Sequence, residues 1–171
     1  MTVLDCILVD HSARTLDQLR ERILTCLGKL NDDQVWSRDG EHENAIGNLV
    51  LHLCGNVRQW IGHAVGGKPD IRVRDREFQA RGGITVDELI QRLTGAVDDA
   101  LVVIRGLESD TLLRRVQVQG YDVTALEALL HVVEHFAQHT GQIILLTKHA
   151  TGQDLGFYRH LGQGAHGEKT P

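Results

Sequence analysis

The chain has 171 residues, of which 42% are hydrophobic, 4% aromatic and 24% charged, and its formal net charge is −5. This length suits one domain with a substantial core, and the small aromatic share favours a helical bundle over a β-sandwich. The mild negative charge argues against a protein that neutralises nucleic-acid phosphates. No apolar run approaches the roughly 18 residues that cross a bilayer, so we expect no membrane partner.

The cysteines indicate a reducing compartment. Cys6, Cys26 and Cys54 are odd in number and show no C-x-x-C spacing, so a disulfide framework is not expected. The N-terminus reads as a polar, capped helix start rather than a secretory leader. We therefore expect reduced thiols and a cytoplasmic protein.

Two long helices are predicted in the first part of the chain. The first begins near residues 2–5, and its apolar residues recur at steps of three and four: Leu16, Leu19, Ile23, Leu24, Leu27 and Leu30. A new cap at 31–33 precedes a short turn at 34–36. The second helix runs over about 43–65 and ends at two glycines. Its stripe consists of Ile46, Leu49, Val50, Leu53, Val57, Trp60 and Ile61.

The middle of the chain combines a long connection with a third helix. Residues 68–83 show no periodicity, and a connection of this length in a compact domain is usually functional. Its arginines alternate with acidic residues, which favours a charged connection over a phosphate site. Thr85-Val-Asp-Glu88 is a capping box that starts the third helix, which extends to about residue 107. Alternating valines within 112–122 predict a short extended segment or hairpin.

A fourth helix is predicted over about 125–149, opened by a second capping box, Thr124-Ala-Leu-Glu127. Its apolar residues cover two faces, so we expect it to pack on several sides, one of them against a second copy of the chain. Together these helices predict an all-α four-helix bundle with a long crossing connection between helices two and three. We expect one domain over residues 1–161 and a flexible tail over 162–171.

The fourth helix carries three histidines spaced four residues apart, His131, His135 and His139. Such spacing lines the side chains along one side of a helix, where they can offer imidazole nitrogens to a metal ion. They drift about 40° per step, so adjacent members can share one ion and all three are not expected to. His131 falls toward the polar side near Glu134, whereas the other two share their arc with apolar residues. We therefore favour His135 and His139 over His131; surface histidines without function are the alternative.

A metal site with open chemistry needs three protein ligands and a free position. His52 lies on the flank of the second helix's apolar stripe, and packing beside the fourth helix would aim it at His135 and His139. On the residues alone, a half-buried histidine bonded to a neighbour is the commoner interpretation of His52. Asn56 and Gln142 are candidate orienting groups, and no carboxylate is assigned to the site.

Four segments stand in a characteristic order and separation: Asn31-Asp-Asp-Gln-Val-Trp36, Ile46-Gly-Asn-Leu-Val-Leu-His52-Leu-Cys-Gly-Asn56-Val-Arg-Gln-Trp60, Arg74-Asp-Arg-Glu-Phe78, and His135-Phe-Ala-Gln-His139-Thr-Gly-Gln-Ile143. Together they make about residues 5–160 resemble the DinB/YfiT-like superfamily of bacterial four-helix proteins. The resemblance implies a metal held by one histidine on the second helix and an i,i+4 pair on the later one, which maps onto His52, His135 and His139.

The same resemblance implies a zinc or nickel ion and a homodimer. Some relatives are metal-dependent transferases of low-molecular-weight thiols and others are hydrolases, so the resemblance implies a metal-dependent enzyme of one of these types without naming its substrate. A metal ion with an open coordination position lowers the pKa of bound water or activates a thiolate, which is the chemistry that both types need.

Two alternatives remain. His131-Val-Val-Glu134-His135 spells H-x-x-E-H, the inverzincin metalloprotease pattern, in which two histidines bind zinc and the glutamate activates water. The other alternative is a non-catalytic metal-binding or stress-related interaction dimer. A coordination position that opens into a pocket would favour an enzyme, and a closed site with four protein ligands would favour the non-catalytic dimer.

Overall fold

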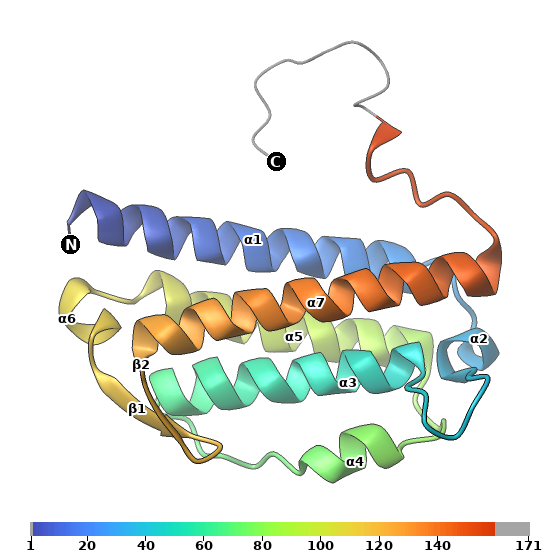
Figure 1. Cartoon of the computed structure of the whole chain (residues 1–171), viewed down its shortest axis with the longest axis horizontal. Helices are drawn as coiled ribbons and strands as arrows, with labels where there is room; N and C mark the ends of the chain where they lie inside the picture. The colour runs from blue at the N-terminus through green and yellow to red at the C-terminus, as the bar shows by residue number, and fades with distance from the viewer. Residues whose placement is uncertain (1, 160–171) are drawn as a thin grey trace.

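Four long helices form the body of the part of the chain that the structure describes, residues 2–159 (Figure 1). The structure is a computed structural model. The long helices are α1 (Val3–Leu27), α3 (Ile46–Val57) with its continuation η1 (Arg58–Val65), α5 (Val86–Arg105) and α7 (Ala125–Thr151). The prediction of an all-α four-helix bundle is confirmed. The expected tail at 162–171 and the last residues of the expected domain lie outside the described residues.

Short elements connect the long helices. These are α2 (Asp32–Trp36), α4 (Arg74–Gln79), α6 (Ser109–Leu112) and the antiparallel strands β1 (Arg115–Val118) and β2 (Tyr121–Thr124). The predicted hairpin at 112–122 is therefore present. Gln119 and Gly120 form its two-residue loop with φ values of 51° and 81°, the backbone of a turn with two left-handed residues.

Capping residues determine where three of the long helices begin. Thr2, Thr85 and Thr124 each accept a hydrogen bond from the backbone N–H three residues ahead, and the acidic side chain there accepts one in return. Each box satisfies donors that a helix N-terminus leaves free. The boxes predicted at Thr85 and Thr124 are thus confirmed.

The second helix ends at Val65 as predicted, but its start and the form of its last part differ from the prediction. It begins at Ile46 rather than at residue 43, because Ala45 is extended, with φ −67° and ψ 160°, and acts as the cap. From Arg58 to Val65 the helix continues as η1 in the wider π form. A π segment inserts an extra residue per turn and changes the direction in which later side chains point.

The apolar stripes meet in one core. Its largest fully buried side chains come from all four long helices and include Leu16, Ile23, Leu53, Ile61, Leu89, Leu93, Phe136 and Ile143. Burial of such side chains contributes roughly 1.5–3 kcal/mol each, so the core holds the helix directions that position the site. None of the described helices combines the length and apolarity needed to span a membrane.

The connection between α3 and α5 positions the site from outside the bundle. It runs back along α3, and α4 lies on the side of α3 away from α7 (Figure 1). No helix is predicted in this segment because six residues are too few to show an apolar stripe. The structure nevertheless places Glu77 of α4 in a buried position against α3.

Candidate metal centre

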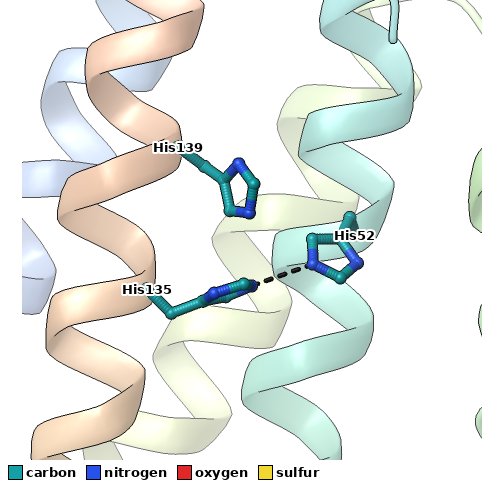
Figure 2. A group of neighbouring side chains, drawn as sticks. All are labelled: His52, His135 and His139. Atoms are coloured by element: carbon teal, nitrogen blue, oxygen red, sulfur yellow. Dashed lines mark hydrogen bonds between the residues drawn. The ribbon is translucent and has the colours of Figure 1, made fainter. Parts of the chain in front are cut away.

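His52, His135 and His139 converge between two helices. In Figure 2 His135 and His139 of α7 point toward His52 on α3. One ligand atom from each of the three lies within 4.8 Å of the others, and the Nε2 atoms of His52 and His135 are 2.9 Å apart. This group could hold a metal ion.

The spacing of the nitrogens fits an ion of the size of zinc or nickel. Nitrogens on a tetrahedral ion lie roughly 3.3 Å apart when each metal–nitrogen bond is about 2.0–2.1 Å. The observed 2.9 Å and the 4.8 Å limit on the whole group bracket that value. Three imidazoles are also the donor type that both metals accept.

The two histidines of α7 are held in their neutral, metal-binding form. Burial lowers the pKa of His135 to about 3, and the neighbouring histidines lower it further in the same direction. Burial also lowers the pKa of His139. At neutral pH both rings therefore keep a free lone pair, which a metal ligand requires.

Glu77 and Arg72 hold the other side of the His52 ring. His52 Nδ1 lies 3.0 Å from Glu77 Oε2, and the Arg72 guanidinium donates to both oxygens of Glu77, each at 2.8 Å. Burial alone would raise the pKa of Glu77, but its hydrogen bonds with Arg72 and His52 lower it overall. The carboxylate is therefore charged, and it is the acidic group at the site that the sequence did not assign.

This pairing selects the tautomer of His52. A carboxylate only accepts hydrogen bonds, so the contact with Glu77 favours a proton on Nδ1 and leaves the Nε2 lone pair free toward α7. Arg72 Nη2 lies 3.1 Å from the same Nδ1 but carries only donors, and its hydrogen bonds go to Glu77. A carboxylate behind a metal-binding histidine fixes the ring and raises the basicity of the ligand.

Gly55 makes room for Glu77 beside α3. A Cβ atom at position 55 would lie 1.9 Å from Glu77 Oε1 and 2.9 Å from Arg72 Nε, closer than any real contact. The absence of a side chain there lets the ion pair of Arg72 and Glu77 lie directly on the helix that carries His52.

Gln142 holds His139 in a similar way. His139 Nδ1 lies 2.6 Å from Gln142 Oε1, so the ring donates to the amide oxygen and leaves Nε2 free. Gln142 thus fulfils the orienting role considered from the sequence. Asn56, the other candidate, is buried, and its Oδ1 has no hydrogen-bond partner among the described residues.

His131 lies elsewhere than predicted. It is half-buried rather than on the polar side of α7, and its ring stacks on Trp60 with a centroid distance of 3.9 Å. Its ring also stacks nearly parallel to His135, at 17° and 5.5 Å, so the two rings do not converge on one point. Glu134 is exposed. This arrangement disfavours the inverzincin interpretation of His131, Glu134 and His135.

Phe78 covers one side of the site. Its ring centroid lies 4.7 Å from that of His52, and the Arg74 guanidinium lies 4.8 Å above the same phenyl ring. The long connection supplies Arg72, Arg74, Glu77 and Phe78. Its length predicted a functional segment, and its alternating charges favoured a charged link over a phosphate site. Arg72, Glu77 and Phe78 contact His52, and Arg74 contacts the Phe78 ring, so the fold shows these roles in a segment without periodicity.

The comparisons with known proteins identify a family and a shared fold. Residues 12–152 match the family model described as mycothiol-S-transferase. A conserved protein from Enterococcus faecalis shares the fold at a TM-score of 0.71 and 15% identity, over 90% of this chain and 99% of that one. A DinB-like protein of Bacillus subtilis, YjoA, shares the fold at a TM-score of 0.67 and 17% identity, over 86% of this chain and 97% of that one. No match was found among curated proteins. Since the family model spans most of the chain, the protein belongs to the mycothiol-S-transferase family of DinB-like proteins.

Proposed function

We propose that the protein is a metal-dependent S-transferase that joins a low-molecular-weight thiol to an electrophilic small molecule. The observation that carries the proposal is the convergence of His52, His135 and His139 in a chain of the mycothiol-S-transferase family. In the reaction the thiol sulfur forms a bond to an electrophilic carbon, the bond from that carbon to its leaving group breaks, and the thiol proton leaves with that group.

Each group of site residues has its own role in this reaction. His52, His135 and His139 offer three imidazole nitrogens, and a zinc or nickel ion bound there would lower the pKa of a thiol presented to it. Glu77 holds the proton on His52 Nδ1 and keeps Nε2 directed at the site. The phenyl ring of Phe78 covers His52 on one side and limits access of water there.

The thiol is supplied by the substrate. Cys54 is buried on α3, and burial raises the pKa of its thiol to about 12, which leaves almost no thiolate at neutral pH. Burial likewise raises the pKa of Cys26. These two buried cysteines are therefore unsuited to attack an electrophile, which supports a small thiol as the nucleophile.

The test is metal analysis and thiol-transfer activity of His139→Ala beside His149→Ala. Both changes remove a histidine from α7, but His149 is exposed and outside the histidine group. We expect about one zinc or nickel ion per chain and thiol transfer to a dinitrophenyl electrophile in the unchanged protein and in His149→Ala. Both should be lost in His139→Ala. Equal metal content in the two variants would contradict the site.

A non-catalytic metal-binding dimer is the second candidate, and the same experiment separates it. If the protein binds metal through the three histidines but transfers none of several small thiols, the non-catalytic dimer replaces the transferase as the function. If it hydrolyses the electrophile instead, a hydrolase replaces the transferase. We also propose a cytoplasmic homodimer. Exposed apolar side chains on α1 and α7, which lie side by side, support the dimer: Val3, Leu4, Ile7, Leu130 and Leu145.

A further inference from the structure

A cavity lies behind His52, between α3, α4 and α5. Its volume is about 370 Å³, and residues of η1 and of the segment 69–73 complete its walls. This size is within the range of pockets that hold small molecules. Arg72 and Glu77 form part of its wall and also contact His52, so this ion pair separates the cavity from the three histidines.

Arginines from three elements converge on this cavity. Arg58 of η1, Arg76 of α4 and Arg92 of α5 all line it. Within residues 2–159 none of these three forms an ion pair, and Arg58 donates only to the backbone oxygen of Arg92, at 3.4 Å. Arg72, the fourth arginine of the wall, is paired with Glu77.

The acidic groups of the cavity are already engaged. Asp70 accepts from Gln59 Nε2 at 2.7 Å and from the Arg72 backbone N–H at 3.1 Å, while Glu77 is held by Arg72. Four arginines and two carboxylates line the cavity, so it carries an excess of positive charge. An anion entering it would find cationic donors without carboxylate partners, which is the arrangement that binds carboxylates and phosphates.

The remaining walls are apolar. Leu51 and Ile84 line the cavity, and so do Ile71 and Val73, which are 86% and 52% exposed. Large exposed aliphatic side chains beside a cavity provide a contact surface for an apolar ligand group. The combination of free arginines and aliphatic walls matches a ligand that is anionic at one end and apolar at the other.

We propose that this arginine cavity binds a small soluble amphipathic anion, a carboxylate or phosphate monoester with a short apolar body, at a site separate from the three histidines. Arg58, Arg76 and Arg92 would contact the anionic end, and Ile71 and Val73 the apolar body. This goes beyond the proposed transferase activity and does not depend on it.

The probe is hexyl phosphate, with 1-hexanol as its uncharged counterpart. Titration calorimetry on the metal-loaded protein should show binding of hexyl phosphate that weakens as sodium chloride is raised, and at least tenfold weaker binding of hexanol, roughly the contribution of one charged hydrogen bond. Shifts of backbone amide resonances should map to residues 69–80. Equal binding of the two probes would overturn the charge assignment.

Variants distinguish the cavity from other sites. The double change Arg76→Gln and Arg92→Gln alters two exposed side chains and should weaken hexyl phosphate binding by about tenfold or more. Arg14→Gln, an exposed arginine of α1 outside the cavity, should leave it unchanged. An unchanged affinity in the double variant would overturn the proposal.

Two further measurements distinguish this cavity from anion binding at the three histidines and from binding to a membrane surface. His139→Ala should retain hexyl phosphate binding, because the proposed site does not use the metal; loss of binding there would place the anion at the histidines and overturn the proposal. Vesicles containing phosphatidic acid should not co-sediment with the protein. Co-sedimentation that disappears in the double variant would make this face a membrane surface instead.

Discussion

Glu77 controls how His52 is presented, although it would touch no metal itself. It is 8% exposed, and its two oxygens accept from Arg72 and from the His52 ring. A carboxylate in this position fixes the orientation of the imidazole and strengthens it as a ligand. The effect of changing Glu77 should therefore appear in metal affinity.

The substitution Glu77→Gln should weaken metal binding by roughly 10–100-fold, measured by competition with a chelating dye. The amide loses one acceptor and the charge, so Arg72 is left unpaired in a buried position, which also costs about 3–5 kcal/mol of unfolding free energy. Chemical denaturation reports that second effect separately.

The matched control is Glu134→Gln, which makes the same chemical change at an exposed position of α7 next to His135. Metal affinity should be unchanged in this variant. If Glu134→Gln loses as much metal affinity as Glu77→Gln, the result would favour the inverzincin interpretation. If Glu77→Gln keeps its metal affinity, Glu77 does not position His52.

At the residue scale, the sequence predicted the part of the site that depends on local periodicity. The four-residue spacing of His135 and His139 fixes them on one side of a helix whatever the tertiary fold. His52 needed the resemblance, because its partners lie on another helix. Glu77 and Arg72 could not be found, since they reach His52 through the path of an irregular connection, and alternating charges in such a segment usually face solvent.

At the scale of the elements, the capping boxes determine where α7 begins and so the register of its histidines. Thr124 Oγ1 accepts from the Glu127 backbone N–H at 3.1 Å, and Glu127 Oε2 accepts from the Thr124 backbone N–H at 2.6 Å. Thr124→Ala should lower the free energy of unfolding by about 1 kcal/mol, measured by urea denaturation.

The control for the capping box is Thr94→Ala, inside α5, where the threonine side chain makes no hydrogen bond within the described residues. Alanine has the higher helix propensity, so this change should be neutral or slightly stabilising. Equal destabilisation by the two changes would show that the box contributes nothing specific at Thr124.

Element boundaries were predicted best where side chains determine them. Thr85 and Thr124 are the N-caps of α5 and α7, and the hairpin loop at Gln119 and Gly120 lies where the alternating valines end. The π form of η1 was not predicted. The stack of Trp60 on His131 explains why that histidine is half-buried instead of solvated.

At the scale of the whole molecule, metal binding should raise thermal stability. A ligand that binds only the folded state at about 100 times its Kd adds about 2.7 kcal/mol, which corresponds to roughly 5–10 °C in Tm for a chain of this size. Differential scanning calorimetry with zinc or nickel should show this rise in the unchanged protein. His139→Ala should show little or none, and an equal rise in both would contradict the site.

The homodimer is also a whole-molecule prediction. Light scattering should give about twice the chain mass of 19.0 kDa, and Ile7→Glu should shift the mass toward one chain, because Ile7 is 56% exposed on α1. The matched change Val102→Glu, at a residue 75% exposed on α5, should leave the dimer intact. A single-chain mass for the unchanged protein would contradict the dimer.

The three histidines come from parts of the chain that are far apart in sequence: His52 and His135 are separated by 83 residues. An ion held between them would act as a reversible cross-link that closes a long loop. Folding already brings the two histidines together, so the ion does not have to offset the entropy cost of closing that loop. We expect local separation of α3 and α7 to be the slow step in its escape. The rate at which a strong chelator removes the ion would then report the rate at which the bundle opens. We expect this rate to change in parallel with the hydrogen-exchange rate of the α7 backbone amides.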